Sequence, residues 1–215
     1  MFADALLARK MLMSECSLTI GDLMVRASPL PAAERRAAIM AATERLLVER
    51  GKGVSTREIA EAAGIAEGTI FRVFPTKEAI IDAIFEQVLD PRPGWEQMKA
   101  IDPQLGLEAS MVELVSMMQR AIRRLMDLVA AVGFRQPRAV PRFDEFRGQA
   151  FDAIASVLRP YADQLRVDAD EAARLLHGMV LSMTNPMMND RPIHDPAQIV
   201  DVVLRGLAAP PRRKP

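Results

Sequence analysis

The sequence predicts an all-α fold. Between clusters of proline and glycine, apolar residues recur every three or four positions, which is the spacing of amphipathic helices. No stretch of useful length alternates between apolar and polar residues as a half-buried strand does. Half of the 215 residues are hydrophobic and 26% are charged, a balance typical of globular chains and not of disordered ones.

The composition excludes several classes of protein. The single cysteine, Cys16, permits neither an internal disulfide nor a cysteine-rich zinc site. The 28 Lys/Arg balance the 28 Asp/Glu, so no global charge directs the chain to nucleic acid or to a membrane. Charges interrupt every apolar run before the roughly 18 residues that a membrane-spanning helix needs. The N-terminus lacks the basic start and clean apolar stretch of a signal peptide, so we expect a cytoplasmic protein without membrane contact.

Changes in composition divide the chain into three segments. Residues 1–30 show little regular spacing, and we expect a disordered extension there. Residues 31–90 hold short periodic stretches and residues 91–215 hold long ones, with a proline-rich linker around Trp95 where the two meet. We therefore expect an N-terminal domain of short helices over 31–90 and a helical bundle over 91–215.

Start and stop signals mark four helices in residues 31–90. Ser55 and Glu58 have the spacing of a capping box, in which each side chain bonds the backbone amide of the other. Gly51 and Gly64 end the helices before them, because glycine readily adopts the left-handed conformation that closes a helix. The predicted helices are Ala32–Arg50, 56–63, a third that carries residues 68–72 and ends before Pro75, and a fourth that Thr76 caps and that runs through Leu89.

Residues 91–215 predict four further helices. Apolar residues from Leu107 to Val132 step by three or four throughout, which indicates one long amphipathic helix. Asp195 and Pro196 are the residue types expected at the cap and at the first position of the last helix. The predicted helices are 107–132, 143–158, 168 to about 184, and 197–207.

The two short helices on either side of Gly64 have the form of a helix-turn-helix. In such a unit the second helix enters the major groove of DNA, while the first crosses the phosphate backbone. The helix N-termini at Ser55 and Ala66 would aim free backbone N–H groups at phosphates. Residues expected to be exposed on the second helix are Glu67, Gly68, Thr69, Phe71, Arg72 and Val73, whereas Ala60, Ala63, Ile65, Ile70 and Phe74 are expected in the core.

Residues 36–85 resemble the DNA-binding domain of the tetracycline-repressor (TetR) family. The family pattern is an aliphatic first helix ending in Gly, an Ile-Ala pair, an Ala-Gly turn, then Gly-Thr-aliphatic-aromatic and Phe-Pro-Ser/Thr-Lys-Glu. This chain matches the pattern with Gly51, Ile59-Ala60, Ala63-Gly64, Gly68-Thr69-Ile70-Phe71 and Phe74-Pro75-Thr76-Lys77-Glu78. The rest of the chain resembles the family only in length and in helical architecture.

The resemblance implies roles in DNA contact for several side chains. Thr56 and Arg57, at the first turn of the first helix of the motif, would contact phosphate or a flanking base. Thr69 and Phe71 stand at backbone-contacting positions, although Phe71 lacks the hydroxyl of the more usual tyrosine. Lys77 would neutralise a phosphate at the start of the fourth helix.

Arg72 is the residue that we expect to read a base. Arginine bonds guanine O6 and N7 in bidentate fashion, although a further phosphate contact is the open alternative. Glu67 stands where a lysine is often found, and it either selects cytosine N4 or repels phosphate. Ala66 replaces a usual serine cap, which weakens that helix start. Residues 31–90 carry eight Lys/Arg and ten Asp/Glu, and this net charge of −2 predicts weak non-specific binding.

The resemblance also implies a homodimer bound to a palindromic double-stranded operator. The last two helices would pair with their copies into a four-helix interface. One apolar stripe available for this pairing holds Ala172, Leu175, Leu176, Met179 and Met183, and the other holds Ile199, Val202, Val203 and Leu207.

A small effector bound between the bundle helices would shift the two recognition helices and release DNA. The leucine-, methionine- and phenylalanine-rich second half predicts that this effector is largely apolar. Candidate pocket residues, each also compatible with a place in the core, are Met111, Met118, Phe143, Phe146 and His177.

The sequence therefore predicts a ligand-responsive transcriptional regulator, with repression as the expected effect. No catalytic residue, cofactor or metal site is expected, because the chain has no nucleophile elbow, no glycine-rich phosphate loop and no paired histidines. The alternative is a helical adaptor or ligand-binding protein that has lost specific DNA binding. Glu67 and the acidic balance favour this alternative, whereas Thr69, Arg72 and Lys77 disfavour it.

Overall fold

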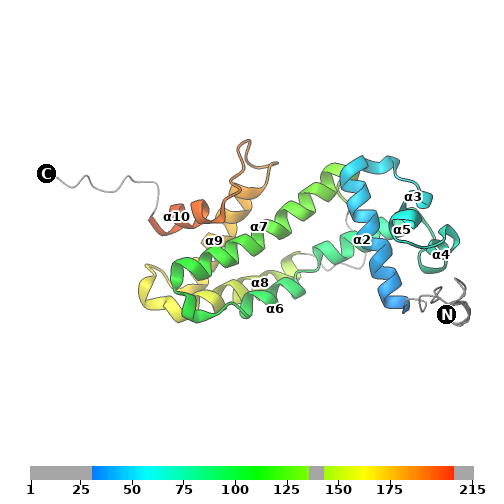
Figure 1. The fold of residues 1–215 in the computed structure, drawn as a ribbon. Coiled ribbons are helices and arrows are strands. Elements are labelled where there is room, and N and C mark those ends of the chain that lie inside the picture. The colour runs from blue at the N-terminus through cyan, green and yellow to red at the C-terminus, as the bar shows by residue number, and fades with distance from the viewer. Residues whose placement is uncertain (1–30, 136–142, 206–215) are drawn as a thin grey trace, which may run out of the picture. The chain divides into compact units, whose positions relative to one another are not determined.

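The regular elements of the described residues are all helices, as predicted (Figure 1). The structure is a computed structural model that describes residues 31–135 and 143–205, without the side chains of residues 143–147. The described residues from Arg36 onward form one compact unit. The elements are α2 (Ala32–Arg50), η1 (Gly51–Gly53), α3 (Thr56–Ala62), α4 (Glu67–Val73), α5 (Lys77–Leu89), α6 (Arg92–Lys99), η2 (Pro103–Leu105), α7 (Leu107–Val132), α8 (Phe143–Leu158), η3 (Arg159–Gln164), α9 (Ala169–Thr184) and α10 (Pro196–Arg205).

Side-chain caps begin the helices where the sequence predicts them. The Ser55 hydroxyl accepts from the Glu58 amide at 3.3 Å, and the Glu58 carboxylate accepts from the Ser55 amide at 2.8 Å, so the capping box is confirmed. Thr76 accepts from the Ala79 amide at 3.1 Å at the start of α5. Asp195 accepts from the Ala197 amide at 2.9 Å at the start of α10. The predicted end of this last helix, at residue 207, lies outside the described residues.

The segment around Trp95 is a helix and not the predicted linker. Pro93 is compatible with α6 because it occupies the first turn, where a backbone amide has no helical partner. The Asp90 carboxylate accepts from the Arg92 amide at 3.1 Å and pairs with its guanidinium at 2.7 Å. Trp95 is buried beside Ala150 and Ala153 of α8. A short helix that buries one large side chain shows too little apolar repetition to be predicted from the sequence.

Two main hydrophobic clusters organise the described residues, and α7 contributes to both. The first joins α2, α3, α4 and α5 with Leu128 and Val132, near the end of α7. The second joins the earlier turns of α7 with α8, α9 and α10. The predicted division of the chain at residue 90 stays a prediction.

Two ion pairs accompany the apolar contacts between α7 and the first cluster. The Arg124 guanidinium donates to both carboxylate oxygens of Glu44 on α2, at 2.5 and 2.7 Å. Arg135, just after α7, donates to Asp82 on α5 at 2.9 Å. Among the described residues, no helix has the length and apolar character that crossing a membrane requires.

Candidate nucleic-acid interface

A tight turn fixes α3 against α4. Gly64 has a φ of +66°, a left-handed conformation that side chains with a Cβ rarely adopt. The Ile65 amide donates to the Ala60 carbonyl at 3.0 Å and closes the end of α3. Ile59 and Ile70, both fully buried, hold the two helices to the first cluster. The predicted helix-turn-helix is therefore present, with α4 as its second helix.

One face of α4 is free for an external contact. Ile70 is 0% exposed, so Gly68 and Arg72, each two positions from it, project from the opposite side of the helix. The Arg72 side chain is exposed and makes no hydrogen bond or ion pair with the described part of the chain. Phe71, beside it, is 52% exposed. The outward face of α4, defined by Gly68, Phe71 and Arg72, thus presents a free guanidinium and an aromatic ring.

Gly68 has no packing role within the described structure. A Cβ placed on it would meet nothing within 4 Å, and its backbone conformation is one that other residues adopt. Glycine within a helix costs stability relative to alanine. The internal contacts therefore give no reason for a glycine here, whereas a surface approaching α4 from outside would.

The first turn of α4 carries a carboxylate instead of a side-chain cap. Ala66 offers no side chain that can accept from the helix amides, as the sequence indicates. Glu67, the first residue of α4, lies near the positive end of the helix dipole, where a negative charge is favoured. Its carboxylate accepts a hydrogen bond from the Thr56 hydroxyl across the turn. One predicted DNA contact, Thr56, is thus already bonded to another.

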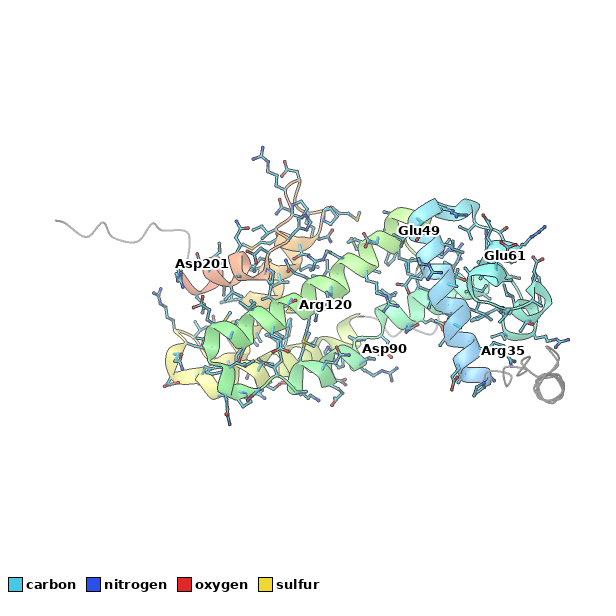
Figure 2. All side chains as sticks on the ribbon, viewed as in Figure 1. Arg35, Glu49, Glu61, Asp90, Arg120 and Asp201 are labelled. Atoms are coloured by element: carbon cyan, nitrogen blue, oxygen red, sulfur yellow. The ribbon has the colours of Figure 1, made fainter. Side chains whose placement is uncertain are left out.

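The start of α3 is similarly engaged. The Ser55 hydroxyl donates to Glu58 at 2.7 Å, and Arg50 donates to the same carboxylate at 2.9 Å. The pKa of Glu58 is lowered, first by the Ser55 amide, then by the Ser55 hydroxyl and the charge of Arg50. Arg57 pairs at 3.4 Å with Glu61, which is labelled on α3 in Figure 2. Both side chains of this pair are largely exposed, so the pair is weak and Arg57 can exchange Glu61 for another anion.

Lys77 connects the start of α5 to the segment before α3. Its half-buried ammonium donates to the Lys52 and Val54 carbonyls, both at 2.9 Å. This leaves one of its three N–H donors for a further partner. Thr69, also half-buried, lies in the first turn of α4, where its amide donates to the Ala66 carbonyl at 2.8 Å.

Arg36 is a further candidate contact, which the sequence alone does not indicate. Its guanidinium lies over the Phe74 ring, 4.3 Å from the centroid, directly after α4 ends. The side chain is exposed, and the stacking fixes a positive charge beside the recognition helix. The sequence offers no local signal for this pairing, because the two residues are far apart along the chain.

The predicted effector residues are only partly described. Met111 and Met118 are buried in the second cluster. The side chains of Phe143 and Phe146 lie outside the described residues. His177 on α9 is half-buried, with its ring edge-on to Phe151 of α8 at 5.5 Å between centroids, and burial lowers its pKa.

The apolar stripes predicted for pairing differ in exposure. Leu176 and Ile199 are buried within the second cluster, so they stabilise this chain's own core. Leu175 is 54% exposed, and Met179 is half-buried one turn further along α9. Leu207 lies outside the described residues.

Comparisons with known proteins place the helix-turn-helix among bacterial regulators. Residues 39–84 match the family described as "Bacterial regulatory proteins, tetR family". A stretch of 50 residues is 42% identical to YvkB of Bacillus subtilis, described as an uncharacterized HTH-type transcriptional regulator. That match covers 23% of this chain and 26% of YvkB, so it spans about a quarter of the relative's length.

Two solved structures resemble the chain over most of its length. One is NalD, the secondary repressor of the MexAB-OprM multidrug efflux pump in Pseudomonas aeruginosa, which is 25% identical with a TM-score of 0.51. That likeness covers 82% of this chain and 97% of NalD. The other is a TetR/AcrR-family transcriptional regulator from Thermobifida fusca, with a TM-score of 0.58 over 82% of this chain and 100% of that one. At 19% identity, this second likeness is one of fold.

Proposed function

We propose that this chain, whose residues 39–84 match the tetR family of bacterial regulatory proteins, binds a palindromic operator as a homodimer and is released by a small, largely apolar effector. Repression is the proposed effect, since NalD, which the chain resembles over most of its length, is named as a repressor. The observation that carries the proposal is the outward face of α4, where Gly68 leaves room and Arg72 has no partner within the described residues.

Base reading is assigned to the outward face of α4. Arg72 donates to guanine O6 and N7 in the major groove, a contact that arginine makes with two parallel hydrogen bonds. Phe71 contacts a sugar or a thymine methyl, because its ring is exposed and has no hydroxyl to bond phosphate. Gly68 allows the backbone of α4 to approach DNA closely, since no Cβ lies in between.

Phosphate contacts surround that face. The helix N-termini at Ser55 and Ala66 direct backbone amides at phosphates. Arg57 exchanges Glu61 for a phosphate, and Lys77 uses its remaining N–H donor. The proposed phosphate-contacting side chains are Thr56, Arg57, Thr69 and Lys77, to which the structure adds Arg36.

Glu67 makes this interface selective at the expense of general affinity. Its carboxylate, oriented by Thr56, can accept from the amino group of cytosine but repels phosphate. Together with the net charge of −2 over residues 31–90, this predicts weak binding to DNA of arbitrary sequence and a modest dependence on salt.

Dimerisation is assigned to the exposed faces of α9 and α10. On α9, Leu175 and Met179 share a face with Gly178 and Ser182, which are small and allow close helix packing. A dimer on a palindrome must hold its two recognition helices about 34–36 Å apart to reach successive major grooves. Any change in the angle between the paired protomers therefore alters the fit to DNA.

The effector acts through α7 in this proposal. The helix shares its earlier turns with the bundle and its last turns with the DNA-binding helices, and Arg124 ties it to α2 through Glu44. An effector that binds the bundle in a state with a different recognition-helix spacing shifts the population toward that state. The size of this population shift is set by the ratio of the effector's affinities for the two states.

The test is fluorescence anisotropy of the protein with the intergenic DNA upstream of its own gene. Its affinity for this DNA is compared with that for scrambled DNA of equal length, at several salt concentrations. We expect selective binding with a modest salt slope. Arg72→Ala should abolish the preference for the operator without changing the oligomeric state, whereas Arg166→Ala, at an exposed arginine between η3 and α9 and outside the helix-turn-helix, should leave both unchanged. An unchanged preference in the Arg72 variant removes the base-reading role.

A helical adaptor that has lost specific DNA binding is the second candidate. Glu67 at the start of α4 favours it, because a carboxylate there opposes phosphate. Equal or absent binding to the two DNAs, combined with a stable dimer, supports this candidate over the first.

A further inference from the structure

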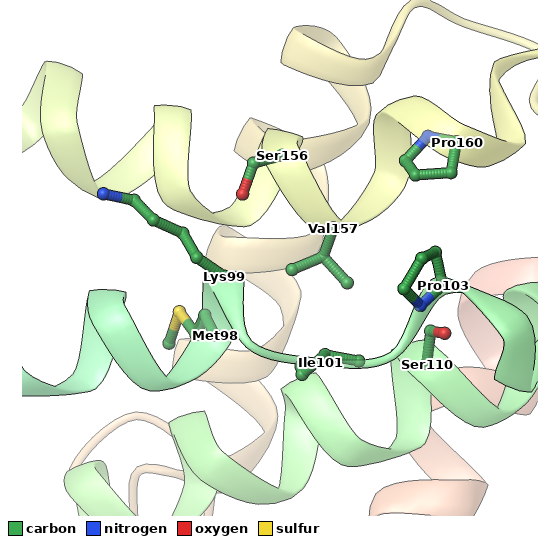
Figure 3. Close-up of a pocket in the computed structure, with 8 residues that line it drawn as sticks. All are labelled: Met98, Lys99, Ile101, Pro103, Ser110, Ser156, Val157 and Pro160. Carbon is green, nitrogen blue, oxygen red and sulfur yellow. The ribbon is translucent and has the colours of Figure 1, made fainter.

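A small cavity lies among the ends of three helices, apart from the helix-turn-helix. Its volume is about 110 Å³, and it is bordered by the end of α6, the start of α7, the end of α8 and η2 (Figure 3). Val157 points across it toward Ile101, and Pro160 faces Pro103. Met98 adds to this apolar wall. The cavity differs from the effector pocket that the sequence predicts, because its lining does not include Met111, Met118 or His177.

Two hydroxyl groups line the cavity, those of Ser110 and Ser156. Both can accept a hydrogen bond, but neither has a proton left to donate. The Ser156 hydroxyl donates to the Ala153 carbonyl at 2.7 Å. The Tyr161 hydroxyl donates its single proton to the Pro103 carbonyl at 2.7 Å. The 2.8 Å contact between Ser110 and Tyr161 therefore uses the proton of Ser110. A ligand that bonds either serine must supply the donor.

The charges around the cavity disfavour ions of either sign. The C-terminal ends of α6 and α8 both border it, and helix C-termini carry partial negative charge, which opposes an anion. The start of α7 offers no free amide through Ser110, because the Ser110 amide donates to the Gly106 carbonyl at 3.0 Å. The positively charged Lys99 lies at the edge of the cavity and repels a cationic ligand. Its ammonium is already paired with Glu96 at 2.8 Å, so it is not free to hold a carboxylate without losing that pair.

We propose that this cavity binds a small uncharged hydroxyl compound, an alcohol or a phenol. The ligand's O–H donates to Ser156 or Ser110, and its hydrocarbon part lies between Ile101 and Val157. For comparison, an enclosed apolar protein cavity of about 150 Å³ holds benzene. This cavity is somewhat smaller, but it is partly open, so part of the ligand can extend out of it. The inference does not rest on DNA binding.

The experiment is a titration of the full-length protein followed by methyl NMR of Ile101, Val157 and Met98. Phenol is the probe, and toluene, which has a similar shape but no donor, is its control. We expect phenol to shift these methyl signals saturably, with a dissociation constant about fivefold below that of toluene, the gain expected from one net hydrogen bond. Ser156→Ala should reduce this ratio, because it removes one acceptor without disturbing the Ser110–Tyr161 bond.

Val157→Phe should fill the cavity and abolish saturable binding of both probes. If that variant does not fold, the half-exposed Ser156→Ala decides the question alone. Equal affinities for phenol and toluene in the wild-type protein would overturn the assigned ligand class. The absence of any saturable shift with either probe would overturn the site itself.

Discussion

Replacing Gly68 with alanine should change folding stability and DNA binding in opposite directions. The new Cβ meets nothing within 4 Å, and Gly68 already has a helical conformation that alanine adopts. Gly→Ala at such a position stabilises a protein by about 0.4–1 kcal/mol, and the first-turn position favours the lower end. The same Cβ projects from the outward face of α4, where DNA is proposed to approach. An obstructed approach that costs about 1.4 kcal/mol weakens operator binding tenfold.

Urea unfolding and anisotropy on operator DNA measure these two effects separately. Gly94→Ala is the matched control, because Gly94 also lies in the first turn of a short helix and its Cβ would meet nothing within 4 Å. It should gain similar stability and keep operator affinity. A Gly68 variant that is stabilised but binds the operator as tightly as the wild-type protein would refute the close approach of DNA. A destabilised variant would refute the assignment of open space around Gly68.

Three further predictions concern the helical bundle and its connection to α2. Thr184→Val should raise the free energy of unfolding, measured in urea, by about 1 kcal/mol, because the buried Thr184 hydroxyl has no partner within the described structure. Thr43→Val is the control and should not raise it, because the Thr43 hydroxyl donates to the Ile39 carbonyl at 2.7 Å. A lower free energy of unfolding in both variants would contradict the assignment. Burial lowers the pKa of His177 below 6.5, so the unfolded chain binds more protons and the free energy of unfolding should fall as pH drops below about 6.5. His177→Gln should reduce that pH dependence in urea titrations at pH 7.5 and 5.5, and equal slopes in the two proteins would rule out this histidine as the cause. A double-mutant cycle of Arg124→Ala and Glu44→Ala should give a favourable coupling of about 0.2–1 kcal/mol, since Arg124 is partly exposed, and additive effects would show that the pair does not stabilise the contact of α7 with α2.

Local signals in the sequence predict the helices and the DNA-binding motif well. Ser55, Thr76 and Asp195 cap helices because a side-chain oxygen close in sequence bonds a free amide, and that bond needs no distant partner. The burial of Ile70 and the exposure of Arg72 follow from helical spacing alone. These features are therefore readable from the order of residues.

Contacts between distant segments are not readable in this way. The sequence places Thr56 and Lys77 at DNA-contacting positions, but it gives no sign that Thr56 bonds Glu67 or that Lys77 bonds the Lys52 and Val54 carbonyls. It also gives no sign that Arg36 lies over Phe74. Each of these partners is brought close only by the packing of whole helices, which apolar periodicity does not specify.

The sharing of α7 between two cores has a consequence for how the protein unfolds. A fragment that ended at residue 90 would lack Leu128 and Val132, and the rest of the first cluster would lose the cover that these two side chains provide. We therefore expect the DNA-binding helices to need a piece of α7 if recombination moves them to another chain. One rigid helix common to both cores should also make them melt in a single cooperative transition, because neither can lose its packing without disturbing the other.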